Sequence, residues 1–394
     1  RESQEDGWFI LRLVLGLLDN TELPPSTLVL VVDVSGSMAG EKLVQAKEAL
    51  RSACARLRPL DRLQILGFSS RVHSFAEVPV FATRENLAGA RTFIDSLIAR
   101  GGTNIDEALA AGLAAARAED RKSTVLLITD GAPTVGVTDA GEITARAKAG
   151  NGGDHRIHVL GVGAQVNTRL LDRLARENRG SRTYLQGSEL EVTLGALLDR
   201  VLFPSLSDLK LTVDGVTVDR LEPPAPWDLF HGDDLVIAGR YRGDGRVQVR
   251  VEGLRGGERR AWTFPAQFPA HGGEDEAAYL WAELRIVRLL EELRDRPADS
   301  VLLQDELVQL SLRYGIVTPY TSYLIREAPR GMISQRLGRM VNISPELKAR
   351  ADREASGFER DQGDEAFDYA RRAAESRRRA GSGGEAAGLS AAPG

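Results

Sequence analysis

Carboxylate and hydroxyl side chains alternate directly after the first strongly apolar segment of the chain. The segment 28–32 contains only Leu and Val, and Asp33, Ser35 and Ser37 follow it within the sequence DVSGSM. An uninterrupted, β-branched apolar run is typical of a strand that is buried on both faces of a sheet. In an open α/β sheet, ligands bind at the carboxyl ends of the strands. We therefore expect the three side chains to converge where a ligand would bind.

Two later loops carry similar oxygen donors. Thr103 follows two glycines, and Asp130 follows a second predicted buried strand at 124–129. Hydroxyls and carboxylates without His or Cys suit the hard cations Mg²⁺, Mn²⁺ or Ca²⁺. Asp33 and Asp130 together only balance a divalent charge, so a bound ion would remain a good acceptor for one more carboxylate, supplied by a partner.

Each of these residues also has an ordinary structural interpretation. Ser35 and Ser37 could simply cap a helix, and Asp130 with Gly131 could form only a turn. Taken singly, each residue favours its ordinary interpretation, and metal binding is favoured only when the residues are taken together as one motif.

The pattern of residues 27–201 predicts an α/β fold with a doubly wound, Rossmann-like sheet. Strands alternate with amphipathic helices, and this alternation produces parallel strands joined by helical crossovers. Strands are expected at 28–32, 62–68, 72–75, 124–129, 157–161 and 182–186. Helices are expected at 41–57, 84–99, 105–118, 139–149, 168–177 and 188–201.

The pattern changes after Phe203 and Pro204, where short strands joined by Gly/Asp turns predict a flanking antiparallel β unit. Its strands are expected at 209–213, 216–221, 235–241, 246–251 and 259–264. The segment 8–16 is also strand-like, and we expect it to join this unit, so that the α/β domain is inserted between its parts. C-terminal helices at 276–295 and 299–314 and a final strand at 316–325 complete the prediction.

The three oxygen-rich loops resemble a known metal site. The sequences DVSGSM, GGTN and TDG are similar, in this order, to the metal-ion-dependent adhesion site (MIDAS) of von Willebrand factor A (VWA) domains, whose pattern is Asp-x-Ser-x-Ser, then Thr, then Asp. The resemblance implies that Ser35 and Ser37 bind the metal ion directly. It also implies that Thr103 and Asp130 exchange direct and water-mediated contacts between conformers, with Asp33 behind them.

The flanking segments resemble a narrower family. The sequences GWF at 7–9, LWA at 280–282 and YGIVTPYTS at 314–322 are similar to inter-alpha-trypsin inhibitor heavy chains and their bacterial relatives, over roughly residues 7–327. Those proteins carry a VIT domain before the A domain, and this chain is expected to begin at the end of one. It has no Asp-Pro-His tail motif, so the resemblance does not extend to covalent attachment to glycosaminoglycan.

These observations divide the chain into five predicted segments. They are an N-terminal strand segment at 1–25 that ends a VIT-like or flanking β unit, the VWA domain at 26–202, the antiparallel β unit at 203–268, a helical segment with the final strand at 269–329, and a charged, partly disordered tail at 330–394.

Composition excludes several classes of function. With 51 Lys and Arg against 56 Asp and Glu, the net charge is −5, which gives no support for nucleic-acid binding. A single cysteine, Cys54, rules out an internal disulfide and a multi-cysteine metal site. The apolar run 8–18 is interrupted by Arg12 and is too short to span a bilayer. The chain does not begin with Met, so we expect a fragment or a processed chain, and an extracytoplasmic or secreted location is favoured.

Three functions remain open. The favoured one is a non-enzymatic protein-binding or adhesion module that uses Mg²⁺ to capture a carboxylate presented by a protein ligand. An intracellular VWA scaffold that cooperates with an AAA-type ATPase is a second possibility. A metal-dependent hydrolase or phosphotransferase is the third, but the three loops supply no general base or nucleophile, so no turnover is expected. Helix 188–201 is a hypothetical switch element, because it links the metal loops to the β unit.

Overall fold

The computed structural model describes residues 7–14, 25–118, 123–153, 155–163, 166–185, 195, 197–198, 202, 204–230, 234–255, 258–269, 275–295 and 300–321. The predicted tail at 330–394 lies outside these residues. So does most of the predicted helix 188–201, of which Gly195, Leu197 and Leu198 are described and helical.

A mixed sheet with helices on both faces forms the first part of the structure. The strands are β2 (Thr27–Asp33), β3 (Arg62–Phe68), β4 (Val72–Ser74), β5 (Val80–Phe81), β6 (Ser123–Thr129), β7 (Arg156–Val162) and β8 (Arg182–Leu185). Their order is β4-β3-β2-β6-β7-β8, and β5 pairs with β3. Neighbouring strands in the series β3-β2-β6-β7-β8 run parallel, whereas β4 and β5 pair with β3 in the antiparallel sense. The doubly wound α/β fold predicted from the sequence is therefore present.

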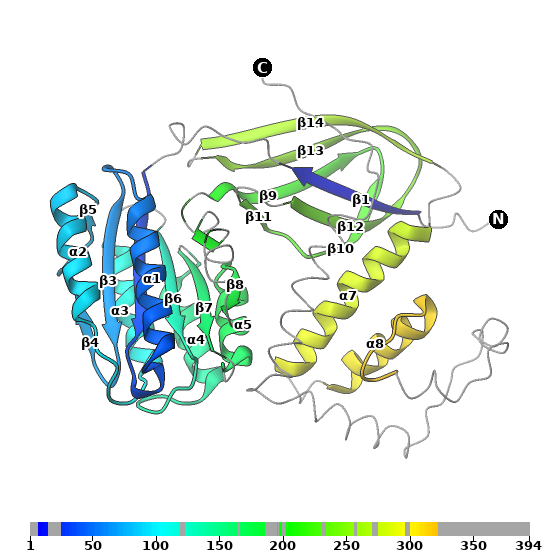
Figure 1. The fold of residues 1–394 in the computed structure, drawn as a ribbon. Helices are drawn as coiled ribbons and strands as arrows, with labels where there is room; N and C mark the ends of the chain where they lie inside the picture. Colours follow the sequence, from blue (N-terminus) through cyan, green and yellow to red (C-terminus); the bar gives the residue numbers. More distant parts are fainter. Residues whose placement is uncertain are drawn as a thin grey trace, which may run out of the picture.

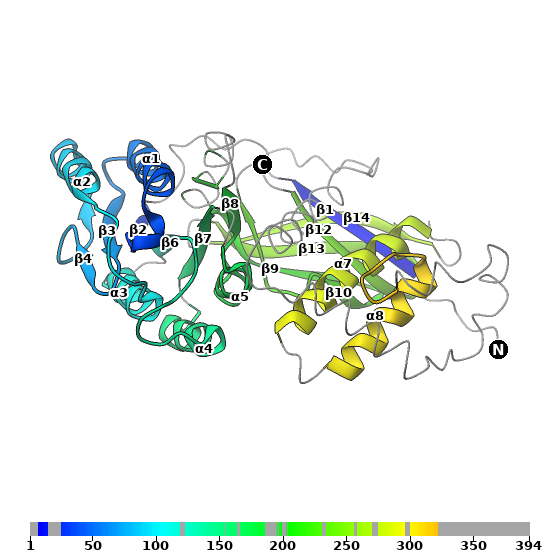
Figure 2. The same cartoon turned by 60° about the horizontal axis from the view of Figure 1, so that its bottom comes forward.

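Side chains of the central strands alternate between two cores, which explains why these strands are apolar throughout. In β2, Leu28 and Leu30 face one core and Val29 and Val31 the other. Helices α1 (Glu41–Arg56) and α2 (Arg84–Ser96) cover the first face. Helices α3 (Ile105–Arg117), α4 (Ala140–Asn151) and α5 (Thr168–Glu177) cover the second. Figure 2 shows α1 and α2 on one side of the strands and α3 and α4 on the other.

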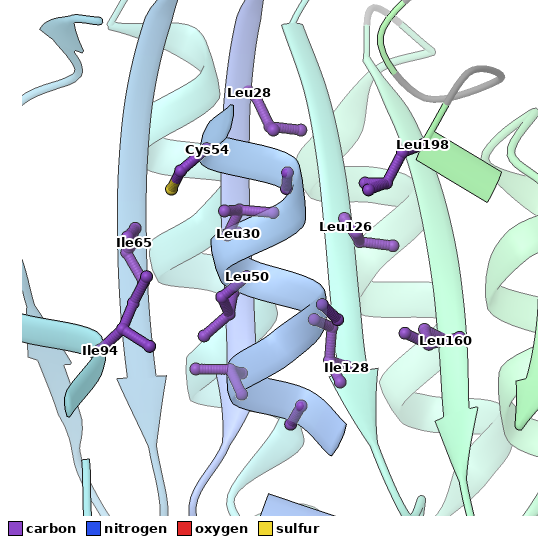
Figure 3. Close-up of a cluster of buried hydrophobic side chains, with 14 of the residues drawn as sticks. Leu28, Leu30, Leu50, Cys54, Ile65, Ile94, Leu126, Ile128, Leu160 and Leu198 are labelled. Carbon is purple, nitrogen blue, oxygen red and sulfur yellow. The ribbon is translucent and has the colours of Figure 1, made fainter. Parts of the chain in front are cut away.

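The first core contains the lone cysteine. Cys54 lies on the inner face of α1, beside Leu50 and above β2 and β3 (Figure 3). Burial raises the pKa of its thiol to about 11. Cys54 is thus a small buried hydrophobe, as the sequence predicted. On the opposite face, a Cβ on Gly112 of α3 would lie 2.9 Å from Val31, so this glycine permits close packing of helix and sheet.

Two antiparallel sheets form a β sandwich beside the α/β domain. Their strands are β1 (Gly7–Val14), β9 (Pro204–Asp214), β10 (Thr217–Glu222), β11 (Trp227–Phe230), β12 (Asp234–Arg242), β13 (Gly245–Arg255) and β14 (Glu258–Phe268). The strand orders are β1-β12-β10 and β11-β9-β13-β14. Apolar side chains of both sheets meet in shared cores. The sequence did not predict β11.

The N-terminal strand belongs to this sandwich. β1 pairs with β12 over its full length, from Gly7 opposite Tyr241 to Val14 opposite Asp234. The α/β domain therefore lies in the chain between two strands of the sandwich. Gly7 is required at its position because a Cβ there would lie 2.1 Å from the ring of Tyr241.

The C-terminal helices α7 (Asp275–Asp295) and α8 (Ser300–Tyr314) pack on each other and on the sandwich. Trp8 of β1 and Trp281 of α7 lie with ring centroids 4.5 Å apart, and Tyr314 and Ile316 belong to the same apolar cluster. The three flanking segments that carry the family resemblance thus meet in space. The predicted strand 316–325 is not found in its described part, residues 316–321, which ends in a turn where Thr318 and Thr321 are hydrogen bonded.

Buried ion pairs connect the last strand of the α/β domain to α7. The guanidinium of Arg182 in β8 lies 2.7 Å from Glu291 of α7 and 3.2 Å from Asp172 of α5. Arg294 of α7 lies 3.1 Å from Asp172 and donates to Thr168 Oγ1 at 2.6 Å. We call Asp172, Arg182, Glu291 and Arg294 the joint cluster.

A second set of ion pairs connects the α/β domain to the sandwich. Arg156, the first residue of β7, pairs with Asp228 of β11 at 3.1 Å. Arg179 contacts Asp228 at 2.5 Å and Asp208 of β9 at 2.6 Å. In Figure 1 the sandwich lies toward the amino ends of the strands of the α/β sheet, whose carboxyl ends point to the lower edge of the view, away from it. None of the described helices is both long and apolar enough to cross a membrane.

Candidate functional site

The loops that carry the predicted donors meet at the carboxyl end of β2. The backbone N–H of Gly36 donates to the carbonyl of Gly101 at 2.9 Å, and that of Arg100 donates to the carbonyl of Val34 at 2.8 Å. These bonds hold the loop after β2 against the loop before α3. A Cβ on Gly36 would lie 3.4 Å from the carbonyl oxygen of Gly101, so the two backbones approach closely.

Asp33 is the fully buried last residue of β2. Its Oδ1 accepts a hydrogen bond from the backbone N–H of Ser35 at 2.8 Å, and its Oδ2 accepts one from Thr129 Oγ1 at 2.6 Å. Burial raises the pKa of Asp33 to about 6, although these hydrogen bonds oppose the shift. Its charge is thus held by neutral donors in a poorly solvated position.

Ser35, Ser37 and Asp130 form a continuous row. The hydroxyls of Ser35 and Ser37 lie 3.0 Å apart, and Ser37 Oγ donates to Asp130 Oδ1 at 3.1 Å. Ser35 and Asp130 are buried, whereas Ser37 is exposed, so the row leads from the interior to solvent. The short helix η2 (Gly36–Met38) gives this loop its shape, with buried Met38 as its anchor.

Thr103 lies in the loop before α3, and its backbone is bonded to the loop after β6. Its N–H donates to Thr134 Oγ1 at 2.8 Å, and its carbonyl accepts from the N–H groups of Thr134 and Val135 at 2.9 and 3.1 Å. The loop after β6 therefore clamps the peptide of Thr103, which is buried two residues after Gly101. We call Asp33, Ser35, Ser37, Thr103 and Asp130 the Ser–Asp cluster.

Lys42, in the first turn of α1, also reaches this cluster, and the sequence-based prediction does not include it. Its Nζ donates to Asp130 Oδ2 at 2.9 Å, so the two oxygens of Asp130 have different partners. The lysine stem passes over Gly163, where a Cβ would lie 2.7 Å from Cε of Lys42. The feature of the sequence that could have pointed to Lys42 is its position near the N-terminus of a helix, where the helix dipole favours anions and not cations.

The donor set fits a hard divalent cation. Two carboxylates and three hydroxyls are the ligand types that Mg²⁺ and Mn²⁺ accept. In the part of the chain that the structure describes, three or more His, Cys, Asp or Glu side chains do not gather in a metal-binding group. A cation at the Ser–Asp cluster would therefore depend on its hydroxyl oxygens as well as on its carboxylates.

A protein-family model matches the part of the chain that contains the site. The family model for the von Willebrand factor type A domain matches residues 26–183. This part of the chain is a von Willebrand factor type A domain. The match includes every residue of the Ser–Asp cluster and Lys42. Domains of this family commonly bind a divalent metal ion and often serve as protein-interaction modules.

The chain is also similar to inter-alpha-trypsin inhibitor heavy chains. It is 28% identical over 350 residues to heavy chain H4 of Bos taurus, and the match covers 83% of this chain and 38% of that protein. It is 30% identical over 322 residues to heavy chain H3 of Homo sapiens, with 76% and 36% covered. The chain thus spans little more than a third of the length of these curated relatives. The similarity extends beyond the A domain into its flanking segments.

Among solved structures, the von Willebrand factor type A protein from Catenulispora acidiphila has a similar fold. The TM-score is 0.55 at 15% sequence identity, and the superposition covers 80% of this chain and 88% of that chain. The shared architecture extends beyond the A domain, since residues 26–183 are less than half of this chain.

Proposed function

We propose that the Ser–Asp cluster binds one Mg²⁺ or Mn²⁺ ion and that the bound ion captures a carboxylate of a protein partner. The observation that carries this proposal is the row from Asp33 through Ser35 and Ser37 to Asp130, which leads from a buried carboxylate to an exposed hydroxyl. A cation on this row would be held from below by the protein and would be open to a ligand above.

Each residue has a distinct role in this proposal. The hydroxyls of Ser35 and Ser37 bind the ion directly, and Asp33 holds the first of these residues through its backbone N–H. Asp130 and Thr103 complete the coordination directly or through water. Two carboxylates balance the ion without excess negative charge, so it keeps its attraction for an acidic ligand.

The proposed role is binding and not catalysis. Hydrolysis would need a base or nucleophile near the ion. The amine of Lys42, which reaches the cluster, donates a hydrogen bond to Asp130. The similarity of the flanking segments to inter-alpha-trypsin inhibitor heavy chains supports a protein-binding role over that of an ATPase-associated scaffold.

Isothermal titration calorimetry of the whole chain with Mg²⁺ and Mn²⁺ tests the metal site. We expect one ion per chain, and Ser37→Ala should weaken binding about tenfold or more because it removes a direct ligand. Ser37 is exposed, so this variant should keep its fold. Ser96→Ala is the matched control: Ser96 is exposed at the end of α2 and bonds only within its own helix.

Equal metal affinity in wild type and Ser37→Ala would contradict the site. Partner capture is tested separately, by pull-down with the metal-loaded protein and with chelator present. Partners that resist chelation do not use the Ser–Asp cluster, and a carboxylate-dependent partner should be lost when its Asp or Glu is amidated.

A further inference from the structure

A lysine is built into the wall of the proposed metal site. Lys42 Nζ lies 2.9 Å from Asp130 Oδ2 and forms an ion pair with it, whereas Asp130 Oδ1 accepts from Ser37. Asp130 has only 5% of its side chain exposed, and Lys42 has 29%. The ammonium group therefore lies between a buried carboxylate and solvent.

The position of this lysine is set by the surrounding fold. Its stem crosses Gly163 at the end of β7, in a space that a side chain at that position would fill. Gly163 has φ of +97°, a conformation that favours glycine. The ammonium group also lies at the positive end of the dipole of α1, which by itself disfavours a cation. The contact with Asp130 offsets this cost. The ion pair therefore accounts for a cation at a helix end that would otherwise disfavour it.

We propose that Lys42 determines ligand specificity at the metal site by giving it a permanent positive charge. This inference rests on the proposed function. With Asp33 and Asp130 ionised, a divalent ion brings the charge of the cluster to zero, and Lys42 raises it to +1. The extra charge attracts an anionic ligand and repels the metal ion.

Lys42 consequently has opposite effects on the two binding steps. Its removal exposes the full charge of Asp130 to the metal ion, which should bind more tightly. The loaded site then loses its net positive charge, and a carboxylate should bind less tightly. A lysine that only supported the loop would weaken both steps together when removed, because both need the same geometry.

The test uses Lys42→Met, which keeps the length of the stem, and Lys42→Arg, which keeps the charge. Lys47→Met is the matched control, because Lys47 lies on the same helix but donates to the carbonyl of Asp95, away from the cluster. Calorimetry gives the Mg²⁺ affinity. Acetate and its neutral analogue acetamide are then titrated into the Mg²⁺-loaded proteins, with the amide signal of ¹⁵N-labelled serines as the readout.

We expect Lys42→Met to bind Mg²⁺ about fivefold more tightly and acetate about fivefold more weakly, with acetamide unchanged. The metal should also raise the melting temperature of Lys42→Met by more than it raises that of wild type. Lys42→Arg and Lys47→Met should resemble wild type. Parallel loss of both affinities, or no change in either, would overturn the inference while metal binding by wild type upholds the site. A wild-type chain that binds no metal would overturn both proposals.

Discussion

The Ser–Asp cluster lies within the A domain and the joint cluster lies between that domain and α7, and the charges of the two clusters are balanced in different ways. In the joint cluster, Asp172 lies beside the guanidinium groups of Arg182 and Arg294. In the Ser–Asp cluster, Asp33 accepts hydrogen bonds from the neutral groups of Thr129 and Ser35. Asp172 is neutralised by protein cations, whereas Asp33 is held by neutral donors and Asp130 has a cation, Lys42, on only one of its two oxygens.

The pKa shifts follow the same division. Burial disfavours the charge of Arg182, but the carboxylates of Asp172 and Glu291 hold its pKa above the ordinary value. Burial raises the pKa of Asp33 to about 6. The joint cluster is therefore complete within the protein. Asp33 lacks a counter-charge of this kind, and its ionised form is favoured by an added cation.

Breaking the joint cluster should have the largest effect on stability. Arg182→Met leaves two buried carboxylates with fewer cations, and we expect the free energy of unfolding to fall by about 3–5 kcal/mol. Mg²⁺ affinity should be unchanged. The four tryptophans lie at 8, 227, 262 and 281, outside residues 26–183, so their fluorescence in urea reports on the sandwich and helices, and circular dichroism reports on the whole chain.

The exposed pair of Arg260 and Glu258 provides the control. Arg260 has 58% of its side chain exposed and pairs with Glu258 at 2.8 Å. Arg260→Met should change stability by less than about 0.5 kcal/mol. If the two variants lose equal stability, the joint cluster does not hold the domains together. If Arg182→Met also weakens metal binding, the two clusters are coupled and the contrast between them fails.

Removing the charge of Asp33 should raise the stability of the protein, whereas breaking the joint cluster should lower it. In metal-free protein at pH 7, Asp33→Asn should raise the free energy of unfolding by about 2–3 kcal/mol, because it removes a poorly solvated charge. The same variant should lose Mg²⁺ binding. Urea unfolding in chelator measures the first effect and calorimetry the second. A metal-free Asp33→Asn chain that is less stable than wild type would show that the charge of Asp33 is already compensated.

The pH dependence of stability should distinguish Asp33 from Asp61, a carboxylate at the opposite edge of the same sheet. Burial pushes the pKa of Asp61 upward, but hydrogen bonds from Arg58 and Ser26 outweigh it and lower the pKa. The stability that Asp61 contributes is present above its unfolded pKa and is lost as the pH falls below about 4. That of Asp33 is present below about 4 and is lost as the pH rises through 6.

Unfolding free energies of metal-free protein between pH 3 and 7 measure both effects. As the pH rises from 4 to 6, wild type should lose stability relative to Asp33→Asn. As the pH falls below 4, wild type should lose stability relative to Asp61→Asn. Slopes of the same sign for both residues would contradict the distinction.

Much of the fold could be predicted from the sequence because its signals are local. The apolar runs of β2 and β6 specify buried parallel strands, and the oxygen donors follow where those strands end. The structure brings Asp33, Ser35, Ser37 and Asp130 into one hydrogen-bonded row. The backbone of Thr103 is bonded instead to Thr134 and Val135 of the loop after β6. The role of the Ser–Asp cluster as a set of metal ligands stays a prediction.

The remaining features depend on contacts between distant residues. Lys42 and Asp130 are 88 positions apart, and Arg182 and Glu291 are 109 apart, so no periodic pattern connects them. β11 was missed because Pro223, Pro224 and Pro226 precede it, and prolines argue against a strand. The strand predicted at 316–325 failed in its described part because a Thr–Thr hydrogen-bonded turn outweighs β-propensity there.

The pairing of β1 with β12 also imposes an order of events during synthesis. Arg12 of β1 and its ion-pair partner Asp234 of β12 are 222 positions apart. At roughly 5–20 residues per second, a ribosome needs about 10–40 s to make the intervening chain. The A domain can fold in that interval because its strands pair among themselves. Until β12 is made, β1 lacks its partner strand, and Trp8, Phe9 and Leu11 lack the apolar contacts that they make in the finished sandwich.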